Sequence, residues 1–200
     1  RWLEMAWQAF GPPRGWRGRA DAGGGRLFDL GAHMIDQVML IFPQAVETVY
    51  SRMHHDYPDH DVESHAMVVI GFDGGATAVV DAGGLHAIPK PRIHAFGTEG
   101  AFIKHGLDPQ EAAMNAGDID SAVEPEENYG RLKNARGERI VPTVPGRWRS
   151  FYENVADALA GRAEPAVKLH EARRAIAVID AARRSAAEGT VVRPQIGPLA

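Results

Sequence analysis

The sequence predicts an α+β fold in which helices pack on one face of an open, mostly antiparallel sheet. The first observation is a run of strand-like segments between residues 46 and 104, joined by glycine-containing turns that favour hairpins. The second is that helical patterns stand before and after this run and do not alternate with its strands. The third is size, because 200 residues, 44% of them apolar, suffice for one substantial core.

Residues 1–10 show a weak alternation of outward and inward side chains that is typical of a strand. Residues 11–25 are rich in proline and glycine and end in three consecutive glycines, so we expect a loop. A loop of this length in a compact domain is often functional. Trp16 and Arg17 within it are therefore candidate ligand contacts, although such pairs also serve packing.

The next segment, residues 26–42, has helical periodicity and ends before Pro43. One apolar flank of this helix consists of Leu27, Leu30, Met34, Val38 and Ile41. A second apolar flank leaves only a narrow polar sector, which holds Asp29, His33 and Asp36. Because a helix this apolar is mostly buried, its polar sector is either satisfied internally or lines a cavity.

The central run contains five expected strands, at residues 46–54, 62–72, 76–85, 92–96 and 101–104. A short helix is expected from Asp108, where Asp and Pro occupy favourable N-terminal positions. Residues 115–137 are polar and irregular. The rest of the chain is expected to form a strand at 139–144, helices at 148–159 and 169–187, and a strand at 190–193.

The helix expected at 148–159 is amphipathic. Phe151, Val155 and Leu159 recur at four-residue spacing and are expected to face inward.

Composition excludes several classes of partner. The formal net charge is −4, with no basic stripe or base-stacking motif, so no nucleic-acid partner is expected. No apolar run reaches the roughly 18 residues of a membrane span, and no signal peptide is visible, so no membrane partner is expected. The chain has no cysteine, which suits a cytoplasmic protein.

Asp29 and His33 are four residues apart, so their side chains are expected to meet on one helix face. A carboxylate beside an imidazole fixes its tautomer and raises its proton affinity, which makes the histidine a usable general base. The same spacing also occurs in ordinary structural pairs, in which the histidine is satisfied by its partner and has no catalytic role. Spacing alone leaves both interpretations open.

Two further patterns carry less weight. The histidines between residues 54 and 94 alternate with acidic residues, but their spacing fits no strong ligand pattern, so no metal site is expected. Gly23, Gly24 and Gly25 precede a helix, yet no Lys-Ser/Thr follows as in a P-loop and the run does not match Gly-x-Gly-x-x-Gly. We expect these glycines to give the backbone the conformational freedom that a tight turn into the helix requires.

The spacing Gly23-Gly24-Gly25-x-x-x-Asp29-x-Gly31-x-His33-x-x-Asp36 resembles the signature helix of the Gfo/Idh/MocA family of NAD(P)-dependent sugar and polyol oxidoreductases. One branch of that family contains NADP-dependent scyllo-inositol dehydrogenase-like enzymes. Further segments resemble that branch, namely Gly97–Glu111, Tyr129-Gly130, Val141–Gly146 and Phe151–Leu159.

The resemblance implies the C-terminal domain of a glucose-fructose oxidoreductase-like enzyme. In that family an N-terminal Rossmann domain binds the dinucleotide, and its fingerprint is absent from this chain, as is the family's Glu-Lys-Pro. We therefore expect residues 1–200 to be a substrate-binding and oligomerisation domain cut from a longer protein, with the N-terminal dinucleotide-binding domain missing. Such a fragment is expected to be inactive alone.

The resemblance also implies a mechanism. Asp29 and His33 fall on the family's catalytic residues, so His33 would take a proton from a secondary hydroxyl of a sugar or inositol-like polyol. Trp16, Arg17 and Tyr129 are the expected substrate contacts, and NADP or NAD would be bound mainly by the missing domain.

The resemblance further implies a homodimer or homotetramer that pairs through the open sheet face. Val68, Ile70 and Val79 or their neighbours are expected to be exposed on that face. Two alternatives are kept: a non-catalytic binding or assembly module that uses the same face, and a small metal-dependent enzyme that uses the histidines.

Overall fold

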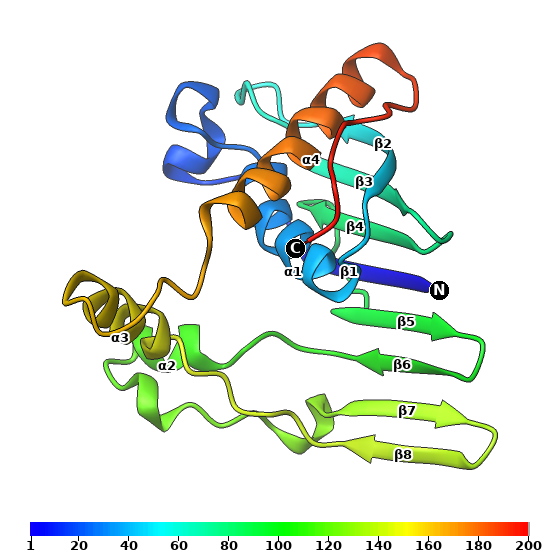
Figure 1. The fold of residues 1–200 in the computed structure, drawn as a ribbon. Coiled ribbons are helices and arrows are strands. Elements are labelled where there is room, and N and C mark those ends of the chain that lie inside the picture. Colours follow the sequence, from blue (N-terminus) through cyan, green and yellow to red (C-terminus); the bar gives the residue numbers. More distant parts are fainter. Residues whose placement is uncertain (200) are drawn as a thin grey trace.

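The computed structural model describes residues 1–199 and contains one eight-stranded sheet with the order β2-β3-β4-β1-β5-β6-β7-β8 (Figure 1). Its strands are β1 (Trp2–Gln8), β2 (Val46–His54), β3 (His65–Phe72), β4 (Thr77–Gly83), β5 (Ile93–Gly97), β6 (Gly100–Lys104), β7 (Gly130–Asn134) and β8 (Gly137–Val141). Neighbouring strands are antiparallel except β1 and β4, which are parallel. The predicted open, mostly antiparallel α+β sheet is confirmed.

Helices α1 (Ala32–Ile41) and α4 (Leu169–Glu188) pack on one face of the β1–β4 half of the sheet (Figure 1). The helices α2 (Gln110–Asn115) and α3 (Arg149–Leu159) lie at one end of the β5–β8 half instead of across it. The expectation of helices on one face therefore holds for half of the sheet. No helix in residues 1–199 combines the length and apolar character needed to cross a membrane.

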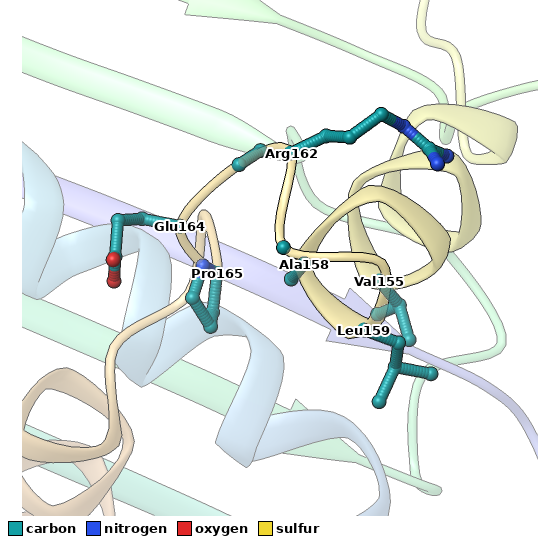
Figure 2. A pocket seen from close by; sticks show the side chains of 8 residues that line it. Val155, Ala158, Leu159, Arg162, Glu164 and Pro165 are labelled. Carbon is teal, nitrogen blue, oxygen red and sulfur yellow. The ribbon is translucent and has the colours of Figure 1, made fainter.

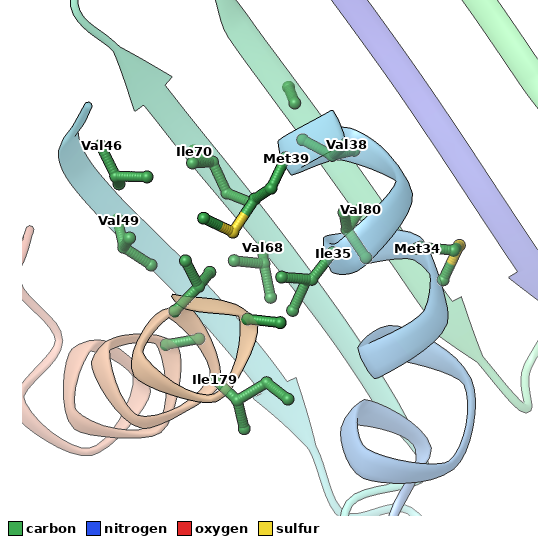
Figure 3. Close-up of a cluster of buried hydrophobic side chains, with 14 of the residues drawn as sticks. Met34, Ile35, Val38, Met39, Val46, Val49, Val68, Ile70, Val80 and Ile179 are labelled. Atoms are coloured by element: carbon green, nitrogen blue, oxygen red, sulfur yellow. The ribbon is translucent and has the colours of Figure 1, made fainter. Parts of the chain in front are cut away.

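The hydrophobic core lies between the β1–β4 half of the sheet and helices α1 and α4 (Figure 3). Ile35 and Val38 of α1, Val68 of β3 and Ile179 of α4 are completely buried. Burial of one such side chain contributes about 1.5–3 kcal/mol. This packing fixes α1 on the sheet and so fixes the polar residues that α1 carries.

The open face of the sheet is identified by the alternation along β3, where every second residue is buried under the helices. Val68 and Ile70 belong to the buried set, so the expectation that they are exposed on the open face was wrong. A shift of one residue moves a side chain to the other face of a strand. Val69 and its cross-strand partner Val79 are half-buried and lie on the open face, as expected for Val79.

Three local expectations also need correction. β7 lies inside the stretch 115–137 that was expected to be irregular, and it pairs with both β6 and β8. Residues 190–193 form only an isolated bridge, Val49 to Val192, where a strand was expected. Phe151, Val155 and Leu159 of α3 are exposed, because α3 lies beyond the core.

Candidate active site at the start of helix α1

The glycines before α1 allow a close approach between the helix start and its surroundings. Gly25 has a φ of +105°, and a Cβ there would lie 2.5 Å from Glu63 Oε1. The Glu63 carboxylate accepts a 2.7 Å hydrogen bond from the Leu27 N–H and so satisfies a free donor at the helix start. Gly25 also donates its N–H to the Arg17 carbonyl at 2.9 Å, which folds the preceding loop onto the helix.

A π-helical turn, Leu27–Gly31, separates this entry from α1. The Ala32 N–H donates to the Leu27 carbonyl, five residues back, where an α-helix would bond four residues back. The turn therefore contains an extra residue, and side chains on either side of it lose the α-helical register. Ile41, in the last turn of α1, is 52% exposed, although it was expected on the buried flank.

Asp29 lies within the π turn and pairs with Arg17 of the preceding loop. Arg17 Nε lies 3.0 Å from both carboxylate oxygens of Asp29, whose side chain is 11% exposed. Within residues 1–199 no hydrogen bond joins Asp29 to His33, so the expected direct contact does not form. Arg17 also lies over the Trp16 ring, with its guanidinium carbon 4.7 Å from the ring centroid. Trp16, Arg17 and Asp29 thus form one chain of contacts.

His33 stands at the first turn of α1 with its side chain exposed, between the buried Gly31 and Met34. Its ring lies against Trp7 of β1, with the centroids 5.5 Å apart. Trp7 in turn has the Arg92 guanidinium 4.8 Å from its centroid. An exposed imidazole held against an aromatic ring can accept a proton from a bound hydroxyl.

Arg92 is a member of this group that the sequence did not reveal. It donates to the Ala6 carbonyl at 3.1 Å and to Gln37 Oε1 at 3.2 Å, and burial lowers the pKa of its guanidinium to about 10. Because Arg92 is still charged at neutral pH, it ties β1 to α1 behind the Trp7 ring. The alternation along residues 1–10 predicted that Trp7 faces inward. Nothing in the sequence pattern connects Arg92 to α1.

Tyr129 is a predicted site residue that lies apart from α1 and from the loop that precedes it. It immediately precedes β7, which is three strands away from β1 in the sheet order. At the usual strand spacing this corresponds to about 14 Å. Tyr129 lies at the same end of the sheet, and its side chain is half-buried there.

A surface hollow lies elsewhere, at the end of α3 (Figure 2). Its lining comes from residues 155–165, including the exposed Leu159, together with Arg162 and Pro165 of the turn that follows. None of the predicted site residues lies within residues 155–165, so none of them lines this hollow.

The histidines between residues 54 and 94 come together only in part, and the His54 and His65 rings have centroids 5.9 Å apart. His65 and His86 converge on Asp81 at the open face, and this is the group within residues 1–199 whose arrangement could hold a metal ion. His94 lies on Phe96 of β5, with ring centroids 4.1 Å apart. The acidic residues of the 55–61 turn take no part in that group, although they are close in sequence.

Comparison with known proteins places these features in a family context. The family model for the oxidoreductase family C-terminal alpha/beta domain, GFO_IDH_MocA_C, matches residues 4–193. Scyllo-inositol 2-dehydrogenase (NADP(+)) IolW of Bacillus subtilis is 29% identical over 183 residues, which are 86% of this chain and 50% of that protein. The chain spans about half the length of the curated relatives it matches.

Solved structures share the fold. The yvaA protein from Bacillus subtilis superposes with a TM-score of 0.85 at 24% identity, covering 96% of this chain and 56% of its own. An NAD-binding protein from Listeria innocua gives a TM-score of 0.76 at 24% identity, covering 96% and 54%. At this identity the likeness establishes the architecture and does not assign roles to residues.

Proposed function

The chain belongs to the Gfo/Idh/MocA oxidoreductase family as its C-terminal α/β domain, and from this premise we propose that it supplies the substrate-binding wall of an NAD(P)-dependent dehydrogenase. The proposed reaction is oxidation of a secondary hydroxyl on a sugar or cyclic, inositol-like polyol. The name of the Bacillus subtilis relative, an NADP-dependent scyllo-inositol dehydrogenase, supports this substrate class. The proposal assigns all of residues 1–200 to the substrate-binding and oligomerisation domain.

The exposed His33 imidazole is the observation that carries the proposal. It stands on a rigid helix between buried neighbours, and Trp7 packs against one side of the ring. Proton transfer needs a base whose position is fixed while its nitrogen stays accessible. We propose that His33 accepts the hydroxyl proton of the substrate.

Asp29 and Arg17 have a different proposed role from the one that spacing implied. Because the Asp29 carboxylate is engaged by Arg17, it is not free to hold the His33 tautomer directly. We propose that the two residues form a charged rim, in which Asp29 accepts and Arg17 donates hydrogen bonds to substrate hydroxyls. The Trp16 ring beside Arg17 offers an apolar surface to the sugar ring, and Tyr129 would contact only a longer substrate.

A nicotinamide cofactor would accept the hydride when bound. The only parallel strand pair in residues 1–199 is β1–β4. The long glycine-containing loop between β1 and the helix does not match Gly-x-Gly-x-x-Gly, and β4 is followed by a loop and β5 instead of a helix. The described residues therefore do not fit a complete dinucleotide cradle. We propose that NADP or NAD is held mainly by a domain outside these 200 residues.

Replacement of His33 tests this function in a protein that joins this chain to a dinucleotide-binding domain. His33→Ala should lower turnover about 10²- to 10⁴-fold, the usual contribution of a general base. His55→Ala, at an exposed loop position, is the matched control and should keep full turnover. Reduction of the nicotinamide is followed by absorbance, and circular dichroism checks the fold. Full turnover by His33→Ala would remove His33 from the mechanism and favour the non-catalytic assembly module.

The proposal also includes a homodimer or homotetramer that pairs through the open sheet face. That face carries half-buried apolar side chains, among them Val69 and Val79, with no helix of residues 1–199 across it. Apolar sheet faces of this kind are rarely left in water.

A further inference from the structure

A cluster of charged and imidazole side chains occupies the open face of the sheet, on the side opposite α1. It consists of His65 at the start of β3, Asp81 in β4, and His86 and Lys90 in the loop after β4. Asp81 is only 6% exposed, although it lies on the face without helices. The cluster takes no part in the proposed proton transfer.

Asp81 is the centre of this cluster. His65 Nε2 lies 2.8 Å from Asp81 Oδ1, and His86 Nε2 lies 3.9 Å from Asp81 Oδ2. The Lys90 ammonium also contacts Oδ2. Both imidazoles therefore present the same nitrogen to one carboxylate, and their ring centroids are 5.0 Å apart.

Gly83 makes this convergence of two rings possible. A Cβ at Gly83 would lie 2.8 Å from His65 Nδ1 and 2.9 Å from His86 Nδ1, closer than real side chains approach. The His86 Nδ1 is buried and has no hydrogen-bond partner among the described residues. A buried polar atom without a partner is uncommon in a native protein, so the fold leaves the His86 ring incompletely satisfied.

We propose that His65 Nε2, His86 Nε2 and the Asp81 carboxylate form a three-ligand site for a divalent transition-metal ion of the Zn²⁺ class. Two imidazoles and one carboxylate, with a fourth position open, make up a common zinc ligand set. The ligand atoms of the three residues all lie within 4.8 Å of one another. Two of the ligands, His65 and Asp81, come from adjacent, paired strands, which fixes their relative positions.

Lys90 has a specific part in this proposal. Its ammonium supplies, in the metal-free protein, the positive charge that the metal would supply to Asp81. The Lys90 side chain is 58% exposed, so it can leave the carboxylate without losing much packing. The bound metal and the Lys90 ammonium thus compete for one carboxylate.

The protonation of the cluster is compatible with metal binding. Burial alone would raise the pKa of Asp81, but contacts with His65 and Lys90 outweigh it and lower the pKa to about 2. Burial lowers the pKa of His86, so its imidazole is neutral at neutral pH. Metal ions bind the ionised carboxylate and the neutral imidazole.

Zinc binding to the chelator-treated 200-residue chain tests the proposal, with Zn²⁺ alone titrated against a chromophoric competitor. Wild-type protein should bind one equivalent. His86→Ala and His65→Gln should each weaken binding by more than about tenfold. His94→Ala removes another histidine of the same face and should leave the affinity unchanged. Lys90→Met removes the competing ammonium and should tighten binding about tenfold.

Co²⁺ provides a second measurement that reports on the ligand set. Cobalt in a tetrahedral nitrogen–oxygen site should give visible d–d absorption that disappears in His86→Ala, a loop substitution that leaves the strands intact. Equal loss of zinc binding in His94→Ala and His86→Ala would overturn the site. Absence of stoichiometric binding in both wild type and Lys90→Met would overturn it as well. Unchanged affinity in Lys90→Met, with wild type binding, would overturn the competition.

Discussion

Arg17 Nε lies 3.0 Å from both oxygens of the Asp29 carboxylate, and this contact joins a loop to the start of a buried helix. The loop reaches the helix because Gly25 bonds the Arg17 carbonyl and can adopt its positive φ. One ion pair thus links the glycine run, the loop and the proposed active site. Because the Arg17 side chain is about half-exposed, the pair contributes little stability by itself, and its effect should appear mainly in catalysis.

Arg17→Ala should therefore lower kcat/KM about tenfold or more in a protein that includes a dinucleotide-binding domain, because Asp29 and the substrate rim lose their fixed positions. Arg19→Ala is the control, since Arg19 pairs with Asp21 on the same loop. Arg17→Lys should restore only part of the activity, because lysine lacks the planar guanidinium that lies over the Trp16 ring. Steady-state kinetics measures both, and equal activity of Arg17→Ala and Arg19→Ala would exclude the proposed rim.

Gly25→Ala should destabilise the chain by about 1–3 kcal/mol, because the residue has φ of +105° and a Cβ would collide with the Glu63 carboxylate. Gly23→Ala is a matched variant, with φ of +74° and open space at the Cβ position. The difference between the two free energies of unfolding, measured by denaturant titration, isolates the collision with Glu63. Equal losses would show that backbone conformation alone accounts for the cost.

Asp36 offers a pH test of the surface near His33. Burial raises the pKa of Asp36 above its ordinary value of 3.8, negative Glu171 raises it further, and His33 partly opposes the rise. The folded state therefore holds the proton more tightly than the unfolded state, so ionisation of Asp36 costs stability as pH rises above that value.

Asp36→Asn should accordingly be more stable than wild type at about pH 7, and the difference should vanish at about pH 3, where both states are protonated. Within residues 1–199 the Asp36 carboxylate makes no hydrogen bond, so the substitution removes none. Denaturation midpoints across this pH range measure the effect. A difference that stays constant with pH would show that the carboxylate charge is not its cause.

The sequence predicted what depends on local pattern. The hairpin between β3 and β4, the short strands β5 and β6, and the buried flank of α1 through Val38 all follow from periodicity and turn residues. The resemblance to a known family added the domain class, whereas the catalytic role of His33 stays a prediction. These features are local or family-wide, so a single sequence carries them.

What the sequence did not predict depends on tertiary context. Asp29 pairs with Arg17 of the preceding loop, and no periodicity in residues 26–42 signals either this contact or the π turn before Ala32. Arg92 reaches Trp7 only because β5 pairs with β1, a contact between segments far apart in the chain. The exposure of α3 was missed because an amphipathic pattern shows that a face is apolar and does not show what covers it.

The open face of the sheet is likewise apolar in part, and a substitution on it tests what covers it. Ile140 of β8 is 57% exposed and, by the chain of strand pairings through Arg131, Ile103 and His94, shares the open face with Val79. Ile140→Glu should dissociate an oligomer that pairs through this face, because the interface would bury an unpaired charge. Arg139→Glu changes the charge on the same strand but on the opposite face, and should leave assembly intact. Sedimentation velocity distinguishes the two variants, and an unchanged mass for Ile140→Glu would place any interface elsewhere on the molecule.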